Sequence, residues 1–234
     1  MTRAAPWAVE EARRHWQADI AALTPEADDS LREAEGQLVL RAWTEPHRAY
    51  HSLQHVVEML GAISEMAQEA APREHQLARA RVAVWYHDLA YDPRATPGSN
   101  EHRSAALARD HLHRLGAQDQ DIDVVEALIL MTVEHDALDS TLHHHGVDQP
   151  LVDVFHDADL WILAAPAQRY AQYARQVREE YQHVPRELFT HGRSQILRGF
   201  ASREQLYRTA YAQRCWTASA RHNIAAELAD LAPS

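Results

Sequence analysis

The stretch that decides the fold is residues 72–93, which read PREHQLARARVAVWYHDLAYDP. Pro72 stands where helices begin, and Ala, Leu, Glu, Gln and Arg, which favour helices, fill many of the positions after it. The second half of the stretch is strongly apolar and ends on the adjacent pair His87 and Asp88. We therefore expect an apolar helix over roughly 72–89 that carries a His-Asp pair at its C-terminal end.

The same helix-favouring residues dominate the whole chain, whereas alternating runs of Val, Ile, Thr and Tyr are nearly absent. Prolines and glycines mark the starts and stops of the expected helices. These helices cover residues 7–23, 30–43, 52–70, 72–89, 100–115, 121–134, 150–163, 166–181, 185–200 and 203–231, the last broken near Trp216. A chain of 234 residues fits one core, and no linker or shift in composition marks a boundary. The sequence therefore predicts an all-α, single-domain helical bundle over residues 1–234.

The charged residues exclude several classes of function. All 23 basic residues are arginine, so Schiff-base chemistry on lysine and a phosphate loop ending in Gly-Lys-Ser/Thr are both excluded. A formal net charge of −11 argues against a nucleic-acid polymer as partner. A small phosphorylated molecule remains possible, because a bound metal can invert the field locally.

A membrane partner is not expected either. No apolar run approaches the roughly 20 residues that a membrane span requires. The first residues lead into charged positions without an apolar signal core, and the single cysteine, Cys215, excludes an internal disulfide. From these features we expect a cytoplasmic protein.

Histidine is the most unusual part of the composition, with 17 residues. Histidine is the commonest metal ligand, so its clusters are candidate metal sites. His51 and His55 are four residues apart and share one face of an expected helix, from which both can reach one metal. Such pairs also arise by chance in a chain this rich in histidine.

Two further clusters contain carboxylates. Asp88 at the end of an apolar helix is unfavourable without a partner, and the helix dipole does not favour an acid there. A divalent cation bound by His87 and Asp88 together would remove that cost. Farther along the chain, Asp159 precedes an apolar stretch, and we expect it to point inward beside the core, with a surface carboxylate as the alternative. Asp157 faces elsewhere on the same helix, where we expect it to cap the helix or to contact solvent.

These three clusters, in this order, resemble the signature of the HD-domain superfamily of metal-dependent phosphohydrolases, which is a His, a His-Asp pair and a distant Asp. The resemblance spans about residues 50–163. The chain is similar in particular to bacterial HD-superfamily phosphohydrolases through EPHR at 45–48, YH at 50–51, WYHD at 85–88, NE at 100–101, RS at 103–104 and DADL at 157–160. The resemblance implies a divalent metal ion (Mn, Mg, Fe, Co, Ni or Zn) held by His55, His87, Asp88 and Asp159.

The first cluster has a second likeness. Tyr-His-x-x-x-His at residues 50–55 is similar to the opening motif of cyclic-nucleotide phosphodiesterases, which share the HD-type metal site. This likeness implies that His51 is the general acid for the leaving oxygen and that His55 binds the metal. Ser52 replaces the asparagine usual in those enzymes, and their longer motif is not matched after Asp88, so a cyclic-nucleotide substrate is not implied.

Further residues are candidates around this site. Asp92 lies four residues after Asp88, where it is equally suited to hold a second cation, to orient the attacking water or to cap the turn at Pro93. Arg103 is the best candidate for binding phosphate, with Glu101 beside it in the matched segment, and Arg193 is a weaker one.

More histidines lie between the second and third clusters. His135 ends an apolar stretch, and we expect it to be a second-metal ligand or a phosphate contact. The triplet at 143–145 either supplies another ligand or belongs to a solvated loop. His102, His111 and His113 are expected on the surface, whereas Tyr170, Tyr173 and Tyr181 are expected in the core.

Together these features predict a metal-dependent phosphohydrolase acting on a small phosphorylated metabolite or nucleotide. A divalent cation lowers the pKa of its water from about 15.7 toward about 7, which makes that water a nucleophile, and His51 is one turn away to act as the acid. One alternative is a mixed-valent di-iron oxygenase of the HD fold, which needs six ligands, including His135 and one loop histidine. The other is a non-catalytic nucleotide-binding module.

Overall fold

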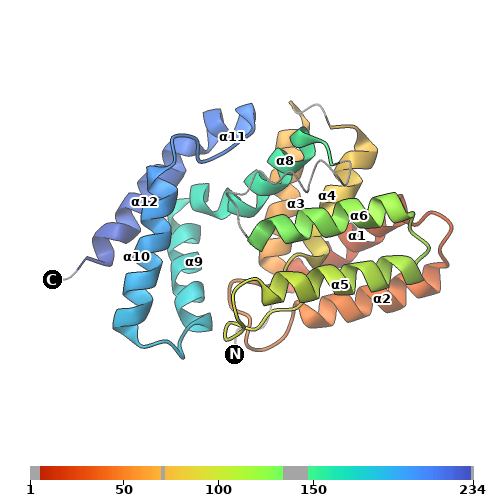
Figure 1. Cartoon of the computed structure of the whole chain (residues 1–234), viewed down its shortest axis with the longest axis horizontal. Helices are drawn as coiled ribbons and strands as arrows, with labels where there is room; N and C mark the ends of the chain where they lie inside the picture. The colour runs from red at the N-terminus through yellow and green to blue at the C-terminus, as the bar shows by residue number, and fades with distance from the viewer. Residues whose placement is uncertain (1–5, 70–71, 134–146, 233–234) are drawn as a thin grey trace.

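The computed structural model describes residues 6–69, 72–133 and 147–232, and all regular structure within these ranges is helical (Figure 1). The α-helices are α1 (Pro6–Leu23), α2 (Asp29–Ala42), α3 (Leu53–Ala67), α4 (Glu74–Tyr86), α5 (Ser99–Arg114), α6 (Asp119–Leu130), α8 (Gln149–Asp159), α9 (Ala167–Glu180), α10 (Arg186–Ser202), α11 (Ala210–Cys215) and α12 (Thr217–Asp230). Short 3-10 helices, η1 (Met131–Val133) and η2 (Leu160–Ala164), follow α6 and α8. The expected all-α fold is confirmed.

Helix α4 lies at the centre of the N-terminal half, in contact with α1, α3, α5, α6 and α8. Its last residues, 82–86, are fully buried. Trp85 and Tyr86 pack edge-on against Trp16 of α1, with ring centroids 5.7 and 6.1 Å apart. The Trp85 indole N–H donates to Asp19 over 2.9 Å, so its polar atom is satisfied inside the core. The apolar run of the sequence is therefore the centre of the core.

The C-terminal helices α9, α10 and α12 form a second group beside α1–α6 (Figure 1, cyan to blue). Helix α8 packs on α3 and α4, and η2 after it contacts α3, α9 and α12, so this segment joins the two groups. Helix α9 also reaches the beginning of α3, because Arg169 donates to Glu58 over 2.8 Å and Tyr173 packs edge-on against Tyr50. The two groups thus meet around the first turn of α3.

The C-terminal segment departs from the expected helix over 203–231. Helix α10 ends at Ser202, residues 203–209 are not helical, and α11 begins after Thr209, while the expected break at Trp216 is confirmed. The cause is Asp157, whose carboxylate accepts hydrogen bonds from the backbone N–H of Arg208 and Thr209 over 2.9 and 2.7 Å. These contacts hold residues 208 and 209 in a non-helical conformation at the start of α11.

Two expectations about single residues are wrong for the same reason. Asp157, expected as a cap or a solvent contact, is fully buried within α8, because donors from residues 208–209 and from His156 surround its carboxylate. His111, expected on the surface, is buried against Glu35, with 3.3 Å between Nδ1 and Oε2. In both cases an oppositely polar group from a distant segment makes burial of the polar side chain tolerable.

Other helix ends differ by a few residues from expectation. Helix α3 ends at Ala67, α4 ends at Tyr86 with His87 as its C-cap, and α6 gives way to η1 at Met131. In the part of the chain that the structure describes, no helix has both the length and the apolar character needed to cross a membrane.

Candidate metal centre

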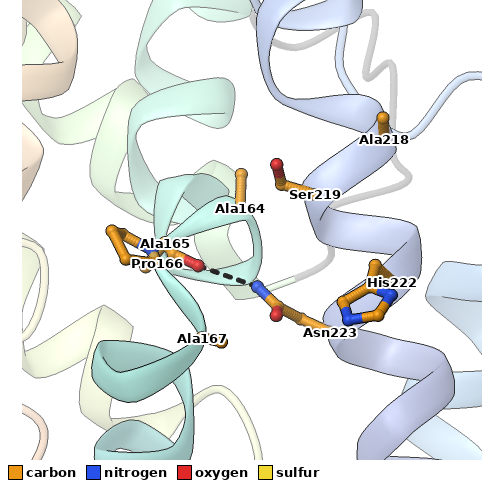
Figure 2. A pocket seen from close by; sticks show the side chains of 8 residues that line it. All are labelled: Ala164, Ala165, Pro166, Ala167, Ala218, Ser219, His222 and Asn223. Atoms are coloured by element: carbon orange, nitrogen blue, oxygen red, sulfur yellow. Dashed lines mark hydrogen bonds between the residues drawn. The ribbon is translucent and has the colours of Figure 1, made fainter.

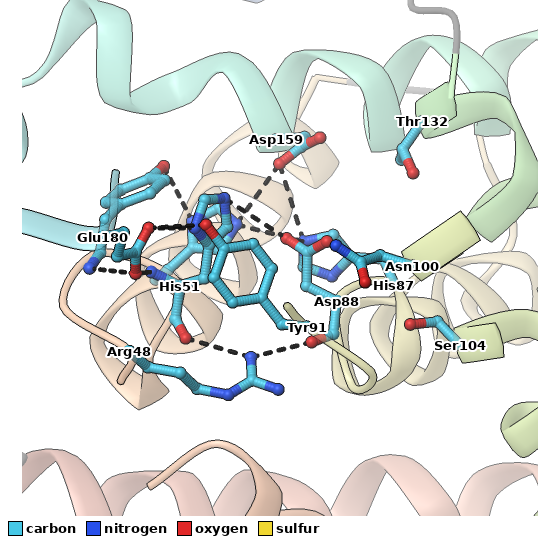
Figure 3. A network of polar contacts seen from close by, with 12 residues as sticks. Arg48, His51, His87, Asp88, Tyr91, Asn100, Ser104, Thr132, Asp159 and Glu180 are labelled. Carbon is cyan, nitrogen blue, oxygen red and sulfur yellow. Dashed lines mark hydrogen bonds and ion pairs between the residues drawn. The ribbon is translucent and has the colours of Figure 1, made fainter. Parts of the chain in front are cut away.

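Three helix ends meet at one point (Figure 3). His55 lies in the first turn of α3, His87 caps the C-terminal end of α4, and Asp159 is the last residue of α8. One potential ligand atom from each lies within 4.8 Å of the others. This group could hold a metal ion. Its first and last members in the chain, His55 and Asp159, are more than 100 residues apart.

The distances within the group fit a shared cation. His55 Nε2 lies 3.2 Å from His87 Nε2, and Asp159 Oδ1 lies 3.4 and 3.8 Å from these nitrogens. Asp88 adds a further oxygen, its Oδ2 being 3.2 Å from His87 Nε2. Two atoms each about 2.1 Å from one ion are about 3.0 to 3.4 Å apart at octahedral or tetrahedral angles. The residues present therefore fit a divalent cation.

Hydrogen bonds behind the imidazoles orient their free nitrogens toward the centre. His87 Nδ1 donates to the carbonyl of Val84 over 2.9 Å, which leaves the Nε2 lone pair facing the other ligands. His55 Nδ1 is 3.1 Å from the Tyr50 hydroxyl. Such contacts fix the ring orientation and the tautomer that a metal requires.

The centre is closed on one side and open on the other. The side chains of His55 and His87 are 3% and 1% exposed, whereas those of Asp88 and Asp159 are 15% and 14% exposed. The imidazoles are therefore the buried members of the group, and the two carboxylates are its solvent-facing members.

The carboxylates favour a positive charge at the centre. Burial disfavours the charged form of His87, yet Asp88 and Asp159 outweigh it and raise the pKa of His87 to about 9. Burial would raise the pKa of Asp88, but His87 and His51 keep it well below its usual range. Burial lowers the pKa of His55, so that imidazole stays neutral. A divalent cation bound here would take the place of the proton on His87, and two imidazole nitrogens with carboxylate oxygens are a ligand set that such a cation prefers.

His51 stands beside the ligands and is held by Glu180 of α9 (Figure 3). His51 Nε2 lies 3.7 Å from Asp88 Oδ2, and its Nδ1 lies 2.7 Å from Glu180 Oε2. Although burial opposes the charged form, Glu180 and Asp88 raise the pKa of His51. Both carboxylates thus favour the protonated form of this imidazole at the edge of the metal group.

Glu180 is fully paired although its side chain is completely buried. Its Oε1 accepts the backbone N–H groups of Ala49, Tyr50 and His51 over 2.8 to 2.9 Å, and its Oε2 also accepts the Tyr91 hydroxyl over 2.8 Å. Sequence reasoning missed this residue. One signal was present: Glu180 shares a helix face with Tyr173 and Val177, both buried, so a carboxylate falls in a core position.

The other expected site residues lie in different surroundings. Asp92 is exposed and accepts the N–H of Arg94 over 2.9 Å, which is the turn-capping role. Arg103 is exposed on α5. The Arg193 guanidinium donates hydrogen bonds to Glu227 over 2.8 Å and to the Tyr173 hydroxyl over 3.0 Å.

Glu101 is half-buried on the first turn of α5, and its Oε2 is buried without a hydrogen-bond partner among the described residues. His135 and the triplet at 143–145 lie outside the described residues, so their expected roles stay predictions. Tyr170 and Tyr173 are buried, as expected, whereas Tyr181 is only partly buried against the core.

A hollow of about 480 Å³ lies elsewhere, between the start of α9 and α12 (Figure 2). Its polar lining consists of Ser219, His222 and Asn223, and the Asn223 amide donates to the carbonyls of Leu163 and Ala165 over 2.9 and 2.8 Å. The hollow contains neither a carboxylate nor any residue of the metal group. The metal group, with carboxylates and imidazoles close together, is therefore the stronger candidate for chemistry.

Comparison of the chain with models of protein families, with curated proteins and with solved structures finds no match in any of the three.

Proposed function

We propose that this chain is a metal-dependent phosphohydrolase of the HD type that acts on a small phosphorylated metabolite or nucleotide. The observation that carries the proposal is the convergence of His55, His87 and Asp159 at one point, with the Asp88 carboxylate beside His87 and with His51 beside Asp88. Ligands alone would fit many metal proteins. A protonated imidazole at their open edge is what hydrolysis of a phosphate ester needs in addition.

In this proposal His55, His87, Asp88 and Asp159 hold a divalent cation. When bound, such a cation stabilises charge on a phosphoryl group and lowers the pKa of water at the site. The carboxylates face the open side, so the substrate phosphate approaches there and the buried imidazoles fix the position of the ligands.

His51 supplies the proton for the leaving group. Its side chain is 21% exposed, so a substrate can reach Nε2 while Glu180 holds Nδ1. Hydrolysis breaks the P–O bond to the leaving group, and the Nε2 proton moves to that oxygen. The incoming water supplies the new hydroxyl of the phosphate product and the proton that restores His51. Glu180 orients the ring and keeps it charged between turnovers.

The test combines metal content with turnover. Protein purified without chelator is analysed for bound metal and is then screened with Mn, Mg, Co, Ni, Fe and Zn against phosphorylated metabolites, with release of inorganic phosphate as the readout. Asp159→Asn is expected to lower both metal content and turnover. Asp153→Asn is the matched control on the same helix, because the Asp153 carboxylate lies outside the metal group and accepts a hydrogen bond from its neighbour Gln149 over 2.8 Å.

The outcome separates the three functions. Metal binding with phosphate release supports the hydrolase. Binding of a nucleotide without turnover across the panel favours the non-catalytic module. Two irons with a half-integer spin signal after anaerobic iron loading favour the oxygenase.

A further inference from the structure

Arg48 lies in the loop between α2 and α3, directly beneath the metal group (Figure 3). Its side chain is 0% exposed. The guanidinium lies close to two aromatic rings, 5.0 Å from the centroid of Trp43 and 5.4 Å from that of Tyr91. Both π-systems attract the cation, and its N–H groups make hydrogen bonds.

The edges of this guanidinium contact the backbone of two site segments. Nη1 donates to the carbonyl of His51 over 3.2 Å and to that of Asp88 over 2.9 Å. Nη2 donates to the carbonyl of Leu89 over 2.7 Å, and Nε donates to Glu45 over 3.3 Å. The Arg48 side chain therefore links the backbone of His51, the expected acid, to the backbone of Asp88, an expected metal ligand.

The chemistry of these contacts requires an arginine. The carbonyls of Asp88 and Leu89 follow the C-terminal end of α4, where carbonyl groups have no partner within the helix and where a cation is favoured. A planar fork of N–H donors can reach carbonyls on two segments at once, whereas a lysine ammonium is a point charge without that fork. Burial lowers the pKa of Arg48, and the nearby carboxylates of Asp88, Glu45 and Glu180 oppose that effect only in part.

We propose that Arg48 is a positioning residue that holds the His51 imidazole in register with the Asp88 carboxylate. The inference rests on the proposed function, since it names what sets the geometry of that same site. Arg48 touches neither substrate nor metal in this scheme. It acts on the two backbone segments, so its loss changes where the acid lies relative to the ligands.

The test compares Arg48→Lys with Arg79→Lys. Arg79 is also a largely buried arginine, on α4, and donates to Asp121 over 2.7 Å without contacting either site segment. Each variant is loaded with Co²⁺, whose visible absorption reports coordination geometry. We expect Arg48→Lys to bind Co²⁺ about tenfold more weakly and with an altered spectrum, as for loss of contacts behind metal ligands. At saturating metal, its kcat should fall further while KM stays near the wild-type value, because the acid is displaced. Arg79→Lys should keep the wild-type affinity, spectrum and kcat.

Each result has one meaning. A folded Arg48→Lys variant with wild-type Co²⁺ affinity, spectrum and kcat overturns the positioning role, and so does an equal effect of both lysine variants. If the wild type itself binds no Co²⁺, the proposed function and this inference fall together; if it binds and turns over, only the comparison of variants decides about Arg48. Should Arg48→Lys fail to fold, Glu45→Gln replaces it, because Glu45 is 46% exposed and holds the guanidinium edge. An altered Co²⁺ spectrum in Glu45→Gln supports the role, and an unchanged one overturns it.

Discussion

The carboxylate of Glu180 lies 2.7 Å from Nδ1 of His51, although 129 residues separate the two in the chain. The contact fixes the ring of the expected acid to helix α9, which belongs to the C-terminal group of helices. The C-terminal helices therefore complete the site rather than merely cover it.

Replacing Glu180 should reveal this contact as a pH-dependent stability. Burial would raise the pKa of Glu180, but His51 and the backbone N–H donors lower it to about 2, from 4.5 when unfolded. Because the pKa of Glu180 is lower in the folded state, the ionised carboxylate stabilises the fold above pH 4.5. This stabilisation is lost as the pH falls toward 2. Glu180→Gln should therefore lose about 3 kcal/mol of unfolding free energy at pH 7. Urea unfolding at pH 7 and at pH 3 measures it, and a difference from wild type that does not shrink at the lower pH would contradict the prediction.

Metal content should separate the ligands from the acid. His87→Ala removes a buried ligand nitrogen, so the purified variant should lose its metal. His51→Ala should retain the metal and lose turnover by about 10² to 10⁴-fold, since only the proton donor is gone. Elemental analysis and phosphate release measure the two effects. Equal metal loss in both variants would show that His51 is a ligand rather than the acid.

Asp157 should be important for the stability of the C-terminal segment. Its buried carboxylate accepts hydrogen bonds from the N–H groups of Arg208 and Thr209 and from the Thr209 hydroxyl. Asp157→Ala leaves these part-buried donors without their acceptor and should cost about 1 to 3 kcal/mol of unfolding free energy. Asp153→Asn on the same helix is the control and should change stability by less than about 1 kcal/mol. Thermal unfolding compares them, and similar losses in both would argue against this role.

Two helical glycines should respond in opposite directions to alanine. A Cβ at Gly36 would collide with the Trp16 indole, so Gly36→Ala should destabilise the protein by about 1 to 3 kcal/mol. A Cβ at Gly61 meets nothing within 4 Å, so Gly61→Ala should stabilise α3 by about 0.5 to 1 kcal/mol. Chemical denaturation of both variants tests this pair. Destabilisation by both would mean that the indole is not what restricts Gly36.

The sequence by itself determined the features that depend on neighbouring residues. Helix propensity and punctuation by proline and glycine act locally, so the all-α fold and most helix positions could be predicted. The His-Asp pair after an apolar helix was also visible, because a carboxylate in such a place needs a partner.

Only the tertiary structure decided which distant groups meet. Glu180 on His51, Arg48 on the carbonyls beyond α4, and Asp157 on residues 208–209 join segments from different helices. A carboxylate can bind a metal, accept hydrogen bonds inside the core or stay in solvent. Which of these it does depends on the donors that packing brings to it, and those donors come from residues far away in the chain. The periodicity of apolar residues within one helix does not reveal these distant donors. For this reason Asp157 was expected as a cap or a solvent contact and His111 on the surface, although both are buried.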